Sequence, residues 1–162
     1  MKNNKEIMEK FDSLCYDEKI EFLADFQGNL DLDIANFLME VSLNRRNDDE
    51  LRIEAIKVIG LYKGQYDDRE IKGKLFSIVF SEDEDEDDEV KVYVLNTLSF
   101  LDLDGKDIEL AKKIINSNEY ILVREAAFSL VSNNKNIPEA RDVLFSLKDD
   151  EVFGKSAQRE LN

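Results

Sequence analysis

Eight consecutive acidic residues starting at Glu82 form the densest group of side chains in this sequence that could do chemistry. Within the run, Asp83, Asp85 and Asp87 have the alternating spacing with which a calcium-binding loop begins. Such a loop requires a glycine at its sixth position, and Asp88 stands there. The run therefore lacks the pattern of a dedicated calcium site, and we predict neither a metal nor another cofactor for this chain.

Other side chains that commonly perform catalysis are scarce. The chain has no histidine, which removes the usual general base and the commonest metal ligand. Cys15 is its one cysteine, which excludes a thiolate zinc site and an internal disulfide, and we interpret it as a packing residue. The spacing of Gly60, Gly64 and Gly73 fits neither a phosphate-binding loop nor a dinucleotide-binding turn. We therefore predict that the protein is not an enzyme and has no small-molecule substrate.

The charge of the chain indicates what kind of partner it attracts. The 162 residues include 37 acidic and 22 basic side chains, which gives a formal net charge of −15. A field of this sign repels nucleic acid and anionic membranes and attracts basic proteins. No apolar run approaches the length of a transmembrane helix, and the first residues do not lead into the apolar segment of a signal peptide. These features predict a cytoplasmic protein with a basic protein partner.

A recurring pattern indicates the elements that must position the acids. Five stretches begin with an aliphatic residue preceded by acidic or amide side chains, and a small or β-branched residue follows four positions later. The aliphatic residues are Ile20, Leu51, Val90, Val123 and Val152, and the residues four positions later are Ala24, Ala55, Val94, Ala127 and Ser156. Because residues four apart share one face of a helix, the pattern predicts helices that turn these residues toward neighbouring helices.

Apolar spacing and turn residues together predict an all-α chain of ten helices in five pairs. The first helix covers 3–14, and the second has Asp17 as its N-cap and ends before Gly28. The other eight are expected at 31–43, 49–62, 68–80, 88–101, 106–116, 119–132, 138–147 and 150–161. Gly73 lies inside one of them and is interpreted as a point of close packing. The acidic segment 81–89 is predicted to be an inserted loop, extended by charge repulsion.

The three middle stretches resemble HEAT repeats, in the short bacterial form. The matching residues are Asp49-Glu50-Leu51-Arg52 with Ala55 and Ile59-Gly60, Asp88-Glu89-Val90-Lys91 with Val94 and Leu98, and Val123-Arg124 with Ala126-Ala127 and Leu130. The outer stretches match less well, because Glu21 and Phe153 stand where the middle ones have a base. The length of the chain is typical of a single domain, which we expect over residues 1–162. The resemblance covers most of residues 17–161 and implies a right-handed α-solenoid of about five helical hairpins with a concave binding surface.

The bases that follow the aliphatic residue in the middle stretches are interpreted as structural. Arg52, Lys91 and Arg124 are expected to reach acids of the adjoining repeat. Beside the acidic run, Tyr93 and Phe100 have the spacing of one helix face. Phe100 is expected to pack between repeats, whereas Tyr93 is a candidate for contact with a partner.

Two interpretations of the acidic run remain open, a solvated loop and an anionic finger that enters a basic cleft of another protein. On the second interpretation the candidate partner-binding residues are Asp83, Asp85, Glu86, Asp87, Asp88, Glu89, Tyr93 and Asn96. Small acidic HEAT-like proteins resemble bacterial immunity proteins, and this resemblance implies an antitoxin that neutralises a basic toxin domain such as a nuclease. The alternative is a general scaffold or adaptor that holds cellular proteins without inhibiting them.

Overall fold

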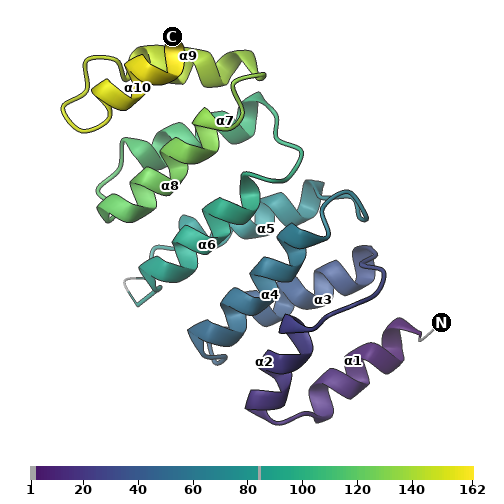
Figure 1. Cartoon of the computed structure of the whole chain (residues 1–162). Helices are drawn as coiled ribbons and strands as arrows, with labels where there is room; N and C mark the ends of the chain where they lie inside the picture. The colour runs from purple at the N-terminus through teal and green to yellow at the C-terminus, as the bar shows by residue number, and fades with distance from the viewer. Residues whose placement is uncertain (1–2, 84) are drawn as a thin grey trace. The chain divides into compact units, whose positions relative to one another are not determined.

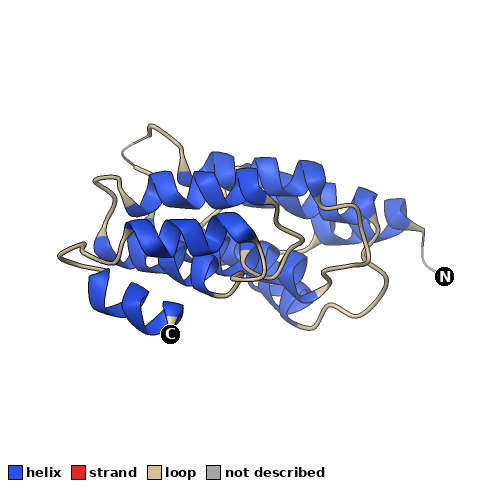
Figure 2. Ribbon diagram, turned by 90° about the horizontal axis from the view of Figure 1, so that it is seen from above, coloured by secondary structure: helices blue, strands red, loops and turns tan. Residues whose placement is uncertain are grey.

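The computed structural model describes residues 3–83 and 85–162, and every regular element in these ranges is a helix (Figures 1 and 2). The helices are α1 (Asn4–Ser13), α2 (Tyr16–Ala24), α3 (Leu32–Leu43), α4 (Asp49–Leu61), α5 (Arg69–Val79), α6 (Asp88–Leu98), α7 (Gly105–Ile115), α8 (Ile121–Ser132), α9 (Pro138–Ser146) and α10 (Gly154–Leu161). The predicted all-α class is confirmed. Within the described residues, no helix combines the length and the apolar character needed to cross a bilayer.

Polar side chains begin several helices where the sequence predicts a start. Asp31 accepts a hydrogen bond from the Ile34 amide at the start of α3, and Asp104 accepts from two amides in the first turn of α7. These bonds satisfy donors that the first turn of a helix leaves without an intrahelical partner. Pro138 opens α9, where its missing N–H removes no helical hydrogen bond.

Two of the predicted helix starts are wrong. The second helix follows Cys15 rather than Asp17, because the Glu18 carboxylate accepts from the Cys15 amide at 2.9 Å and so satisfies the donor that precedes the helix. The last helix starts at Gly154 rather than at residue 150. Asp150 Oδ1 accepts from the amides of the two residues before Gly154, at 2.8 and 2.9 Å, and this holds the segment in a turn.

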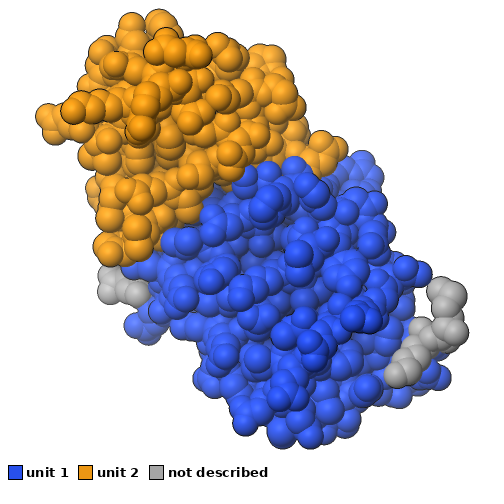
Figure 3. All heavy atoms as spheres, viewed as in Figure 1, with its two compact units in different colours: residues 1–101 blue, residues 102–162 orange. Residues whose placement is uncertain are grey.

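The chain divides into two compact units, residues 1–101 and residues 102–162, which Figure 3 shows in different colours. The first unit contains α1 to α6 and the second contains α7 to α10. The single domain expected over residues 1–162 stays a prediction.

Unit 1 consists of two layers of helices. In one layer α3 packs against α1 and α5, and in the other α4 packs against α2 and α6. The layers meet where α3 contacts α4 and α5 contacts α6. An aliphatic core lies between them, and its side chains at most 2% exposed include Leu38, Ile56, Ile59, Leu75 and Leu95. Full burial of one such side chain is worth about 1.5–3 kcal/mol, so this core supplies the main stabilisation of the unit.

Unit 2 is built around contacts of α7 with α8 and α9, and of α9 with α8 and α10. Its aliphatic core includes Ile108, Ile115 and Leu130, all fully buried. Phe128 of α8 stacks on Phe153, which immediately precedes α10, with ring centroids 5.2 Å apart and planes 10° from parallel. This aromatic pair joins α8 to the last helix of the unit.

The repeated positions are buried in the middle stretches and not at the ends. In the three middle stretches, both the aliphatic residue and the residue four positions later are at most 3% exposed. These residues are Leu51, Ala55, Val90, Val94, Val123 and Ala127. The prediction is wrong for Ala24, which is exposed, and for Val152, which is 54% exposed while Phe153 is buried beside it. Helices at the end of a unit pack against fewer neighbours, so fewer of their repeated positions are buried.

Gly73 does not mark close packing, because a Cβ built on it would have no neighbouring atom within 4 Å. The glycine at a point of close packing is Gly60. A Cβ there would lie 3.2 Å from both the methyl group and the hydroxyl of Thr97, where α4 meets α6. Gly64 has a different role, since its φ of +86° allows the left-handed turn between α4 and α5.

Candidate functional site

The acidic segment 81–89 is anchored to the core of unit 1 by Glu86. The Glu86 carboxylate lies 2.8 Å from Nη1 and 3.0 Å from Nη2 of Arg52, and neither side chain is more than 3% exposed. Arg52 Nε donates to the Ser42 carbonyl at 2.7 Å, which occupies a further donor of the guanidinium. Two parallel charge-assisted bonds of this kind offset the cost of burying both ions. The segment is therefore an anchored loop and not one extended by charge repulsion alone.

A second arginine reaches the same loop from the turn between α3 and α4. Arg45 pairs with Asp83, and its Nε lies 3.7 Å from Glu86. Sequence reasoning missed Arg45. The available signal was the adjacent pair Arg45-Arg46, two bases in one turn of a strongly acidic chain.

The other predicted acids have distinct surroundings. Asp87 is half-buried and caps α6 by accepting from the Glu89 amide at 2.7 Å. Asp85, Asp88 and Glu89 are exposed, with the last two in the first turn of α6. Glu84 lies outside the described residues. Of the predicted partner-binding acids, Asp83, Asp85, Asp88 and Glu89 are therefore exposed. Glu86 is buried, so its carboxylate is not accessible to a partner.

The expected contact between a base and an acid of the adjoining repeat is confirmed for Arg52, through Glu86. Arg124 behaves differently, because its Nε donates to the Ile115 carbonyl at 2.7 Å and its guanidinium lies 5.3 Å from the centre of the Phe153 ring. Both arginines share one feature: each binds a carbonyl near the end of the preceding helix. Such a bond satisfies an acceptor that the helix end leaves open.

Tyr93 and Asn96 lie on the outward side of α6, which contacts α4, and Lys57 of α4 reaches the Tyr93 ring. We call the outward surface of these two helices the α4–α6 face. It consists of Glu50, Glu54, Lys57 and Leu61 from α4 and of Glu89, Tyr93, Asn96 and Phe100 from α6 and the residues directly after it. The residues from each helix follow one another at intervals of three or four, so they share one side of that helix.

Charged and aromatic groups meet at the centre of the α4–α6 face. The Lys57 ammonium lies 2.8 Å from Glu54 and 5.2 Å from the centre of the Tyr93 ring. The hydrogen bond to Glu54 raises the pKa of Lys57. Tyr16, at the start of α2, extends the surface, since its hydroxyl is 3.5 Å from Glu50. Removal from water, followed by the charge of Glu50, raises the pKa of Tyr16.

The far end of the α4–α6 face is apolar and exposed. Leu61 is 79% exposed and Phe100 is 60% exposed, and the Lys63 ammonium lies 5.4 Å from the centre of the Phe100 ring. The expectation that Phe100 packs between repeats is therefore wrong, because α6 ends at Leu98 and Phe100 points to solvent beyond it. The face thus runs from carboxylates near the helix starts to apolar side chains near the helix ends.

The described residues contain no group of three or more histidine, cysteine, aspartate or glutamate side chains placed to hold a metal ion. The α4–α6 face combines aromatic and aliphatic side chains with charged ones, and its exposed apolar groups are Leu61 and Phe100. The chain matches no protein-family model, and neither a curated protein nor a solved structure is significantly similar to it.

Proposed function

We propose that the protein binds a basic protein through the α4–α6 face and the exposed acids of the adjoining loop. The observation that carries this proposal is the pairing of Leu61 and Phe100, both more than half exposed, with carboxylates on the same surface. Exposed apolar side chains bordered by polar ones are typical of protein-binding surfaces.

Charge favours a cationic partner. Asp85, Asp88 and Glu89 are exposed at one end of the face, and the chain as a whole carries a net charge of −15. Exposed carboxylates accelerate association with a positive surface, while apolar contacts made in the complex slow dissociation. The buried pair between Arg52 and Glu86 supports this role, because it holds the loop in place before a partner arrives.

We further propose that the complex neutralises its partner, as a cytoplasmic immunity protein neutralises a toxin domain such as a nuclease. This step depends on the resemblance of the middle stretches to HEAT repeats in a right-handed α-solenoid. Active clefts that act on nucleic acid are lined with basic side chains, and an anionic protein surface can occupy the same electrostatic well. A general scaffold would use the same face without inhibiting what it binds.

The test begins with affinity capture of partners from the native cytosol at low and at high salt, followed by measurement of inhibition. We expect one basic polypeptide whose capture weakens as salt rises and whose activity is lost at equimolar ratio. Several partners that keep their activity would instead indicate a scaffold. Capture of an acidic polypeptide would contradict the proposal.

Matched variants then locate the contact. Asp85→Asn with Asp88→Asn and Glu89→Gln should weaken binding about tenfold at low salt, chiefly through slower association. Asp12→Asn with Glu40→Gln and Glu70→Gln removes the same charge from exposed sites off the face and should leave the affinity within about twofold. Equal losses in the two triple variants would show that net charge alone matters and that the α4–α6 face is not the contact.

The apolar end is tested separately with Leu61→Ser and Phe100→Ser. Truncation of an exposed anchor should speed dissociation and leave the salt dependence of binding unchanged. Unchanged dissociation in both variants would remove the apolar end of the face from the proposed contact.

A further inference from the structure

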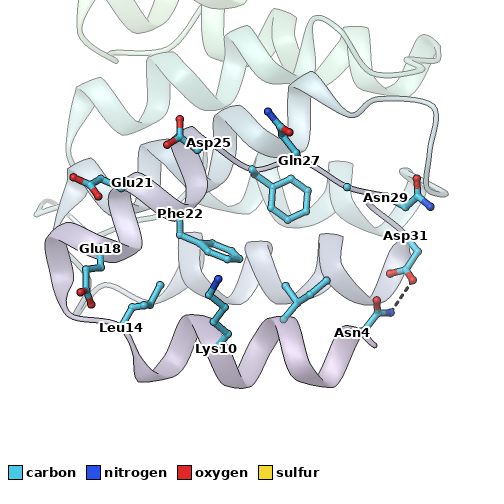
Figure 4. A pocket seen from close by; sticks show the side chains of 13 residues that line it. Asn4, Lys10, Leu14, Glu18, Glu21, Phe22, Asp25, Gln27, Asn29 and Asp31 are labelled. Atoms are coloured by element: carbon cyan, nitrogen blue, oxygen red, sulfur yellow. Dashed lines mark hydrogen bonds between the residues drawn. The ribbon is translucent and has the colours of Figure 1, made fainter. Parts of the chain in front are cut away.

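A groove of about 700 Å³ opens between α1, α2 and the segment that follows α2 (Figure 4). Its apolar lining consists of Ile7, Leu14, Phe22 and Phe26, and its acidic lining consists of Glu18, Glu21, Asp25 and Asp31. The groove belongs entirely to unit 1 and shares no residue with the α4–α6 face. A groove of this volume is within the range that binds small molecules.

One ammonium of the chain itself lies beside the aromatic lining of the groove. Lys10 is the one base among the described residues that line it, and its ammonium lies 5.7 Å from the centre of the Phe22 ring. Figure 4 shows the Lys10 side chain rising from α1 toward that ring. An ammonium over an aromatic face is attracted by the negative charge density of the ring. The Phe22 ring is thus accessible to an ammonium group from the groove side.

Two of the four carboxylates are fixed in the ionised form by hydrogen bonds. The Cys15 amide lowers the pKa of Glu18, and the Asn4 side chain, followed by the Ile34 amide, lowers the pKa of Asp31. Both are therefore anionic at neutral pH. A carboxylate has about four lone-pair sites, so these bonds leave capacity for another donor.

The arrangement of charge matches a ligand with an ammonium at each end. In the view of Figure 4, Glu18 and Glu21 lie at one end of the groove and Asp31 lies at the other, with the Phe22 ring between them. An aliphatic chain can lie on the apolar floor while its terminal ammonium groups reach the two acidic ends. A ligand with a single ammonium would satisfy one end only.

We propose that this groove binds a linear polyamine, with the alkyl chain against Phe22 and the ammonium groups at the carboxylates. The proposal is independent of the protein-binding function, because it concerns a different surface. Binding should be saturable at one molecule per chain in about 0.15 M salt, where non-specific attraction between an acidic protein and a cation is largely screened.

The experiment titrates the full chain with spermidine, followed by calorimetry and by NMR shifts of backbone amides. We expect one site, with the largest shifts in α1, α2 and the segment between Asp25 and Asp31. Titration with Mg²⁺ and with Nα-acetyl-lysine amide, which has a single ammonium group, should give binding at least tenfold weaker. Shifts spread over all acidic surfaces, or equal affinity for Mg²⁺, would mean adventitious cation binding only and would overturn the proposal.

Two pairs of variants make the test specific. Glu21→Gln with Asp25→Asn should raise the Kd for spermidine about five- to tenfold, whereas Glu6→Gln with Asp12→Asn, which removes equal charge outside the groove, should leave it within twofold. Lys10→Met removes the ammonium that would compete with the ligand in the groove, and it should lower the Kd for spermidine several-fold. Lys5→Met, on the same helix but outside the groove, should lower the Kd less. Equal effects within either pair would contradict a site in the groove, and thermal unfolding checks that each variant is folded.

Discussion

Arg52 and Glu86 show how one residue pair decides what an acidic run does. Glu86 belongs to a stretch of eight acids, yet its carboxylate is buried and bound at both oxygens by one guanidinium. The neighbouring Asp85 is exposed to solvent. Removing one ion of a buried pair leaves the other ion buried without its partner, whereas a surface carboxylate keeps its hydration. The two neighbouring acids therefore differ in how much each contributes to stability.

At the residue scale we predict that Glu86→Gln lowers the free energy of unfolding by about 3 kcal/mol, because it leaves the buried Arg52 charge with only one other carboxylate among the described residues, that of the half-exposed Asp49 at 3.4 Å. Asp85→Asn is the matched control and should change it by less than about 0.5 kcal/mol. Urea unfolding at pH 7, followed by circular dichroism, measures both. A double variant, Arg52→Met with Glu86→Leu, should lose less than Glu86→Gln does, and a loss below 1 kcal/mol for Glu86→Gln would contradict the anchoring role.

At the scale of the single helix, the surroundings of a glycine decide the sign of a substitution. Gly73 lies within α5 with open space around it, so Gly73→Ala should stabilise the protein by about 0.5–1 kcal/mol through its lower backbone entropy in the unfolded chain. Gly154 opens α10, and a Cβ there would lie 2.9 Å from the Lys148 carbonyl oxygen, so Gly154→Ala should destabilise it. Thermal unfolding of both variants checks the prediction, which fails if the two substitutions shift Tm in the same direction.

The cap of α3 makes stability depend on pH. Hydrogen bonds from the Asn4 side chain and the Ile34 amide hold the pKa of Asp31 below its ordinary value. The unfolded chain therefore takes up this proton at a higher pH than the folded chain does. The contribution of Asp31 to stability is present above the unfolded pKa and is lost as pH falls through the folded pKa.

We accordingly expect Asp31→Ala to cost about 1 kcal/mol at pH 7 and progressively less as the pH falls below about 4. Asp33→Ala in the same first turn is the comparison, since Asp33 is exposed and does not cap the helix. Urea unfolding at pH 7 and pH 3 measures both variants. A cost for Asp31→Ala that is the same at both pH values would show that its carboxylate charge is not involved.

At the scale of the whole molecule, the net charge of −15 opposes the folded state through repulsion among its carboxylates. Raising the salt concentration from about 20 mM to about 200 mM shortens the Debye length and should raise Tm by a few degrees. Sodium chloride and potassium chloride should act alike, because screening depends on ionic strength. A Tm that falls over this range would mean that exposed ion pairs, such as Arg69 with Asp67, outweigh the repulsion.

Several features of the fold follow from neighbouring residues, and these the sequence determines by itself. Leu51 and Ala55, or Val90 and Val94, lie four apart on one helix face, so local spacing is enough to predict both the helices and their buried sides. Pro138 and the acids before the helices fix most boundaries to within a few residues. A net charge and a lack of histidine are likewise properties of composition.

Tertiary structure alone decided which polar and apolar groups are available to a ligand. Arg52 and Glu86 are 34 positions apart, and no local pattern distinguishes Glu86 from the acids beside it. Phe100 lies just beyond the end of its helix and is 60% exposed, although its spacing from Tyr93 predicts a shared helix face. The groove is lined by residues of α1, of α2 and of the segment after α2, which are brought together only by the packing of these elements. Periodicity sets which face of a helix is buried, whereas contacts between distant residues set what remains at the surface.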